Sequence, residues 1–117
     1  MNYTEFTKEC FKHSKLYNND QVCKELELLG LYDSSYKNDT CPSFTLEIDD
    51  DKHIQLFLAN SENDNIDNEE FNSSVLSYND DENNIYEYIF ESEDIWIIWS
   101  VIKSNFKYKA PTKETSL

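Results

Sequence analysis

Residues 43–58 have the sequence SFTLEIDDDKHIQLFL, and this stretch decides the fold class. Phe44 and Leu46 alternate with polar side chains, which is the period of a strand that buries one face. A second apolar run, residues 54–58, follows the acidic segment 49–52. Because strands joined by a short polar segment pair antiparallel, we predict a β-hairpin with an acidic turn.

Two more strands are predicted downstream, at residues 73–78 and 85–90, with a polar acidic turn at 79–84 between them. The second of these strands is rich in aromatic residues and isoleucine, which strands favour. Residues 95–102 allow two interpretations. Their apolar side chains match a helical face, but their β-branched and aromatic composition and the short turn at 91–94 favour a strand. We therefore predict a further strand there, paired with its predecessor.

The residues upstream of the hairpin have a helical period. Tyr3 and Phe6 begin a first amphipathic segment, and Val22 and Leu26 mark one face of a second, which ends near Gly30. The sequence thus predicts an α+β protein in which two N-terminal helices pack on an antiparallel sheet of four or five strands.

The chain of 117 residues has the length of one domain. We expect a single α+β domain over residues 1–109 and a flexible tail over 110–117. Cys10, Cys23 and Cys41 have neither disulfide-like nor zinc-like spacing, so free thiols are expected. No apolar run approaches the roughly 20 residues of a membrane span, and the first residues do not resemble a secretory signal. A cytoplasmic location without membrane contact is therefore expected.

The charge of the chain is strongly negative and unevenly distributed. It has 24 acidic residues, ten lysines and no arginine, a net charge of −14. Residues 41–94 hold sixteen acids against one lysine, which gives −15, so this segment carries essentially the whole negative charge. Such a chain repels phosphate, which argues against direct nucleic-acid binding, and it attracts cationic proteins. The alternative to a partner-binding surface is a solvated acidic surface that only keeps the protein soluble. A net charge of about 2 to 8 is enough to keep a small domain soluble, so this alternative does not explain −14.

No constellation of residues predicts catalysis, a metal site or a cofactor. The single glycine excludes nucleophile-elbow motifs and phosphate-binding glycine loops. His53 follows three aspartates and is either a general base or, as we favour, a solvated turn residue. A calcium-loop template placed over the acidic segment fails at its glycine and glutamate positions, which are Asn68 and Ser74. Trp96 and Trp99 either stack on a ligand or, as is commoner, lie in the core. We therefore expect a protein that is not an enzyme.

The predicted partner-binding residues are the carboxylates of the turns and of the acidic segment between the second and third strands. They are Asp49, Asp50, Asp51, Glu62, Asp64, Asp67, Glu69, Glu70, Asp80, Asp81, Glu82, Glu91, Glu93 and Asp94.

A small α+β chain without arginine, rich in Asn and Asp and with acidic hairpin turns, resembles the immunity proteins of contact-dependent growth inhibition systems and related bacteriocins. The resemblance covers the overall character of the chain, and no residue role is carried over from it. It implies that the chain neutralises a cognate basic toxin, the C-terminal nuclease domain of a larger protein, by covering its active site, and an RNase is favoured over a DNase. The alternative is a phage-type nucleic-acid mimic that inhibits a restriction or CRISPR nuclease. A mimic is expected to space its carboxylates regularly along helices or strands, whereas these concentrate in loops and turns.

Overall fold

The computed structural model describes residues 3–36, 41–60 and 73–106. The predicted tail at 110–117 and most of the acidic segment between the second and third predicted strands lie outside the described residues. In chain order, the elements are α1 (Tyr3–Cys10), α2 (Asp20–Leu28), β1 (Tyr32–Asp33), β2 (Ser43–Glu47), β3 (Lys52–Phe57), β4 (Ser74–Asp80), β5 (Ile85–Ser92) and α3 (Ile95–Asn105).

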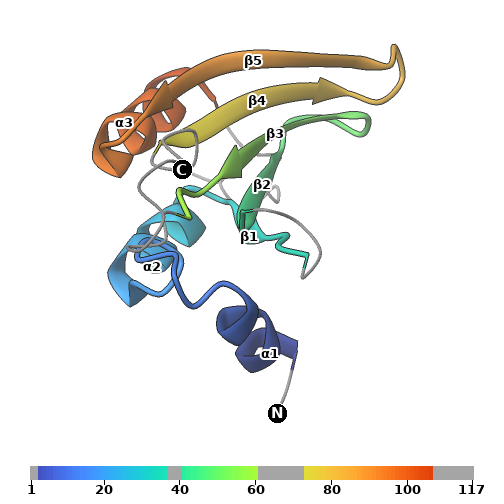
Figure 1. The fold of residues 1–117 in the computed structure, drawn as a ribbon. Helices are drawn as coiled ribbons and strands as arrows, with labels where there is room; N and C mark the ends of the chain where they lie inside the picture. The colour runs from blue at the N-terminus through green and yellow to red at the C-terminus, as the bar shows by residue number, and fades with distance from the viewer. Residues whose placement is uncertain (1–2, 37–40, 61–72, 107–117) are drawn as a thin grey trace, which may run out of the picture.

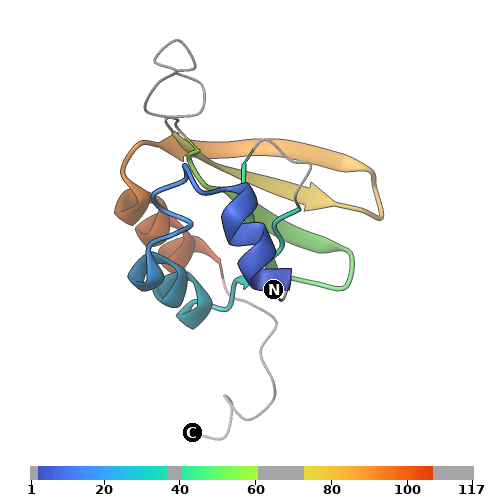
Figure 2. The same cartoon turned by 60° about the horizontal axis from the view of Figure 1, so that its bottom comes forward.

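The five strands form one antiparallel sheet in the order β1-β2-β3-β4-β5, so that each strand pairs with its neighbours in the chain (Figure 1). The helices pack on one face of this sheet (Figures 1 and 2). The predicted α+β class with an antiparallel sheet is therefore confirmed. The fifth strand is Tyr32–Asp33 rather than the predicted one at 95–102.

The prediction of a strand at residues 95–102 is wrong, because Ile95–Asn105 is a helix. Ile98 and Ile102 are buried, whereas Ile97 is 47% exposed, and this spacing is helical. Asp94 caps the helix: its Oδ1 accepts a hydrogen bond from the backbone N–H of Trp96 at 2.9 Å. The cap and the 3.6-residue period thus outweigh the strand preference of the isoleucines and tryptophans.

The helical layer differs from the two N-terminal helices of the prediction, because α1 has only eight residues and the C-terminal helix α3 joins the layer. In α2, the side chain of Asn19 accepts hydrogen bonds from the N–H groups of Gln21 and Val22 at 3.0 and 3.2 Å. Gly30 follows the helix with φ of 105°, a conformation that glycine adopts without steric cost. None of the helices within the described part of the chain is long and apolar enough to cross a membrane.

The hydrophobic core lies between the sheet and the helices. Tyr17 is fully buried in it, in edge-to-face contact with Phe11 and Phe44 at centroid distances of 5.8 and 6.4 Å. Its hydroxyl donates a hydrogen bond to Asp33 Oδ2 at 2.8 Å, and burial followed by this contact raises the pKa of the phenol. The other buried apolar residues of the core are Val22, Leu26, Leu31, Leu46, Ile54, Leu56, Leu58, Leu76, Ile95, Ile98 and Ile102.

Candidate functional site

Two of the predicted acidic turns lie side by side at one end of the sheet (Figure 1). The β2–β3 turn and the β4–β5 turn meet there because the strands run as a meander, and Lys52 lies opposite Asp80 in the pairing of β3 with β4. The backbone N–H of Asp81 donates a hydrogen bond to the backbone oxygen of Asp51 at 2.8 Å. This bond links the two turns, so their relative position is fixed.

We call the exposed carboxylates of these two turns the acidic tip: Asp49, Asp50, Asp51, Asp81 and Glu82. Lys52 lies beside them, and the charge of Asp80, with smaller contributions from Asp49 and Glu82, raises the pKa of its ammonium group. The five carboxylates outnumber this lysine, so the tip is strongly negative, and its exposed side chains are accessible to a partner.

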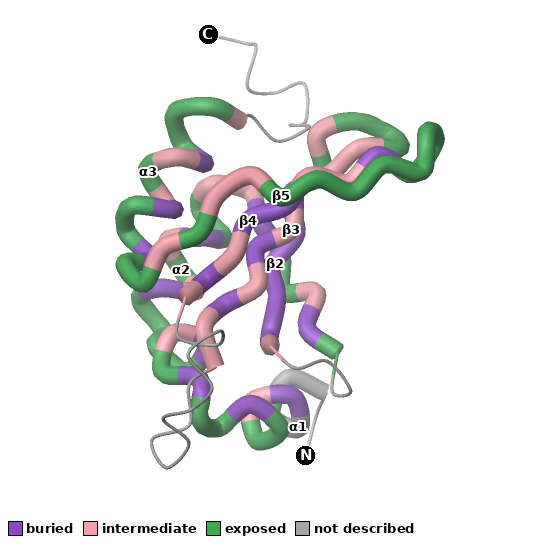
Figure 3. The backbone as a smooth tube through the Cα atoms, turned by 45° about the horizontal axis from the view of Figure 1, so that its top comes forward, coloured by how far each residue is buried: buried purple, intermediate pink, exposed green. Residues whose placement is uncertain are grey.

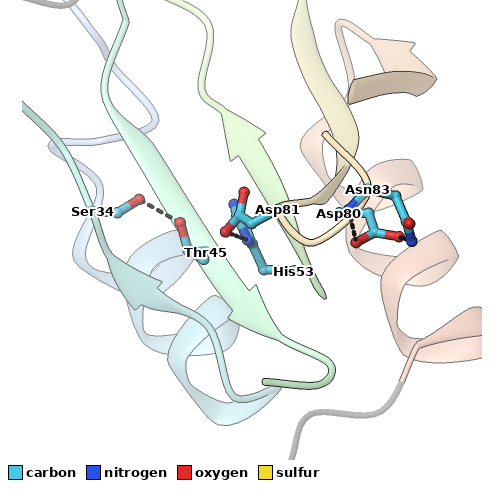
Figure 4. Close-up of polar contacts among 6 residues, drawn as sticks. All are labelled: Ser34, Thr45, His53, Asp80, Asp81 and Asn83. Atoms are coloured by element: carbon cyan, nitrogen blue, oxygen red, sulfur yellow. Dashed lines mark hydrogen bonds and ion pairs between the residues drawn. The ribbon is translucent and has the colours of Figure 1, made fainter. Parts of the chain in front are cut away.

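Asp80 has a structural role instead. It is only 4% exposed, and its carboxylate accepts hydrogen bonds from the backbone N–H and the side-chain Nδ2 of Asn83 at 3.2 and 2.9 Å (Figure 4). The bonds from Asn83 lower the pKa of Asp80, with a smaller contribution from Lys52. Within the same turn, Asn84 has φ of 55°, which a short polar side chain tolerates better than most. Asp80 therefore closes the turn that presents Asp81 and Glu82.

His53 lies on the sheet next to the acidic tip. Its Nδ1 is 3.9 Å from Asp81 Oδ2 (Figure 4), which is too long for a hydrogen bond, so the two residues form an ion pair only when the imidazole is protonated. In the strand pairing, His53 lies opposite Glu47 on one side and Asn79 on the other. Among the described residues, no group of three His, Cys, Asp or Glu side chains is arranged to hold a metal ion.

The remaining predicted acids are placed elsewhere. Glu91, Glu93 and Asp94 lie at the opposite end of β5, where the chain enters α3, so the third acidic turn does not join the other two. Asp94 is the N-cap of that helix. Glu62, Asp64, Asp67, Glu69 and Glu70 lie outside the described residues.

Three exposed tyrosines on the sheet were not predicted from the sequence. Tyr32 on β1 is 49% exposed, and Tyr86 and Tyr88 on β5 are 62% and 59% exposed. The β4–β5 hairpin projects beyond the rest of the sheet, and residues 81–88 are exposed throughout (Figure 3). Aromatic residues in a strand are expected to be buried, so only the structure, in which β1 and β5 are the two edge strands, reveals these side chains as a surface.

Comparison with protein-family models, with curated proteins and with solved structures found no match to this chain.

Proposed function

We propose that this chain is an inhibitor of the immunity-protein type, which docks its acidic tip onto a cationic nuclease toxin in the cytoplasm. The observation that carries the proposal is the pair of acidic turns joined by the bond between Asp81 and Asp51. Two turns held together in this way present their carboxylates in one preformed arrangement, and a partner need not order them on binding.

Electrostatics supports a basic active site as the target. A nuclease must present cationic groups to the phosphates of its substrate. The carboxylates of the acidic tip compete for those groups, so a bound tip excludes the nucleic acid. The whole chain, at −14, also repels nucleic acid and accelerates association with a cationic protein. The same negative charge thus attracts the partner from a distance and blocks its active site on contact.

The test measures binding between this chain and the C-terminal domain of the protein that the neighbouring gene encodes. Binding is measured by calorimetry at about 50 and 300 mM salt, and inhibition is measured as the residual cleavage of RNA and of DNA by that domain. We expect a complex whose affinity falls at least about tenfold between the two salt concentrations, because exposed charges are screened within roughly 10 Å.

A matched pair of variants locates the contact. The tip variant carries Asp49→Asn, Asp51→Asn and Asp81→Asn, and the control carries Glu9→Gln, Asp20→Asn and Glu27→Gln, which are exposed acids outside the tip and outside the predicted partner-binding set. Both variants lose three negative charges, but only the tip variant should lose binding and inhibition. Equal losses would mean that net charge acts without a defined site, and an unchanged tip variant would refute the proposal. Binding to a restriction or CRISPR nuclease, in competition with its DNA, would identify a nucleic-acid mimic instead.

A further inference from the structure

The face of the sheet opposite the helices has a regular cross-strand pattern. Strand pairing aligns one residue from each strand in a single row across this face: Tyr32, Thr45, Gln55, Ser77 and Tyr88. Residues on the other face of the same strands, such as Leu46 and Leu56, lie in the core with the helices. In Figure 4, Ser34 and Thr45 lie in front of the sheet and the helices lie behind it. No described helix covers this face.

The middle of the row is polar and already hydrogen-bonded. Thr45 Oγ1 donates to Ser34 Oγ at 2.7 Å (Figure 4), and the hydroxyls of Ser34 and Ser43 share a hydrogen bond at 3.0 Å. Ser77 Oγ donates to the backbone oxygen of Gln55 at 3.4 Å. Thr45 and Ser77 are buried, whereas the tyrosines at the two ends of the row are exposed. A ligand on this face therefore meets aromatic side chains at both edges and polar, hydrogen-bonded side chains between them.

Each of these two tyrosines is paired with a glutamate. Tyr32 lies opposite Thr45, two residues before Glu47 on β2, and Tyr88 shares the helix-free face of β5 with Glu91. Both glutamates are exposed. Partial desolvation first, and then the neighbouring carboxylate, raises the pKa of each phenol, so both rings stay neutral at physiological pH. Each edge of the face thus holds an uncharged ring beside a carboxylate.

The pair on β5 depends on a β-bulge. Leu76 lies opposite Phe90, but the next residue, Ser77, lies opposite Tyr88, so Ile89 is an extra residue in β5. If Ile89 instead took a regular place in the ladder, side-chain alternation would put Tyr88 and Glu91 on opposite faces of the sheet. Bulges often redirect a side chain at a functional surface.

We propose that the two tyrosine–glutamate pairs, Tyr32 with Glu47 and Tyr88 with Glu91, bind two arginine side chains of the cationic partner. The inference rests on the proposed function and names a second contact surface for the same partner. A guanidinium group stacks its plane on an aromatic ring and donates forked hydrogen bonds to a carboxylate, and each pair offers both. Four inter-strand spacings separate the pairs, so the two arginines should be about 19 Å apart.

Charge complementarity favours a cationic protein over a second copy of this chain on the face. In a face-to-face dimer, the glutamates of both copies would approach one another, and each copy carries a net charge of −14. Like charges brought together at an interface oppose binding.

The test uses synthetic peptides and needs no knowledge of the natural partner. In the long peptide, five prolines separate two arginines, which a polyproline helix holds about 19 Å apart. In the short peptide, two prolines separate them by about 9 Å, and a third peptide has lysines at the arginine positions of the long one. Affinities are measured by NMR titration at low salt. We expect the long arginine peptide to bind at least about threefold more tightly than either control, because only it engages both pairs together.

Variants decide whether the pairs are responsible. Tyr88→Ala and Tyr32→Ala should each reduce the affinity for the long peptide to that for the short one, and Glu91→Gln should weaken it as well. Tyr86→Ala is the matched control, since Tyr86 lies on the same strand and face and is 62% exposed. Circular dichroism of every variant verifies the fold.

The outcomes separate this inference from the proposed function. An equal loss in Tyr86→Ala, or no preference for the long spacer, would overturn the inference. So would a spacer preference that disappears in the tip variant and survives in Tyr88→Ala, because the peptide would then bind the acidic tip. In each of these cases, calorimetry with the nuclease domain still tests the proposed function independently.

Discussion

Replacing Ile98 by alanine tests the helix at residues 95–105, with Ile97→Ala as its internal control. Ile98 is fully buried in the core, whereas Ile97, its neighbour in the chain, is 47% exposed. Truncating a fully buried isoleucine costs about 2–5 kcal/mol in the free energy of unfolding. Burying a whole isoleucine side chain contributes about 1.5–3 kcal/mol, so the half-buried Ile97 loses roughly 1 kcal/mol. The better helix propensity of alanine offsets about 0.4 kcal/mol of that loss.

The assay is urea denaturation followed by far-UV circular dichroism and by the fluorescence of Trp96 and Trp99, which lie on the same helix. Coincident transitions and an unchanged dependence on urea would show that both variants unfold in two states. In a strand, Ile97 would share a face with Ile95, and Ile98 would point the other way. A larger cost for Ile97→Ala than for Ile98→Ala would therefore refute the helical assignment.

Three further predictions concern single side chains. Asp80→Asn should lower the melting temperature at pH 7, and the difference from wild type should vanish in acid. The pKa of Asp80 is lowered in the fold, so its stabilisation is present above the unfolded pKa of about 3.9 and is lost as the pH falls through the folded value; thermal melts at pH 7 and at about pH 2 measure this. Asp94→Ala should cost about 0.5–2 kcal/mol as the loss of an N-cap, and Asp94→Asn should restore most of it in denaturant titrations. Tyr17→Phe should cost about 1–3 kcal/mol by removing the hydrogen bond to Asp33, and an unchanged urea midpoint would contradict that bond.

The parts of the fold that the sequence predicted correctly have a strong local signal. The alternation around Phe44 and Leu46 produces β2. The acidic segment before β3 and the one after β4 become turns. The helix at 95–105 was missed because composition was weighted above spacing. Asp94, followed by isoleucines at a helical period, was a cap signal that the sequence already contained. In contrast, β1 has only two residues, and its conformation is set by pairing with β2 rather than by a local pattern.

The same distinction applies to the candidate site. The acidic turns were visible in the sequence, and their adjacency follows from a meander of consecutive strands. The role of Asp80 was not visible, because its burial depends on the closure of the turn by Asn83. The pairing of Tyr88 with Glu91 was also hidden, since residues three apart in a regular strand point to opposite faces. Only the register of β4 against β5 reveals the bulge that brings them together.

The extra residue Ile89 has an evolutionary consequence. Deleting that one codon would close the bulge and leave every pair of β4 with β5 in place, so that Tyr86 and Tyr88 would stay on the helix-free face. The projecting hairpin would then display the same chemistry on a strand that is one residue shorter. Descendants of such a gene can lose this codon without changing their recognition surface, and a gap at this position in aligned sequences would not mark a change of partner.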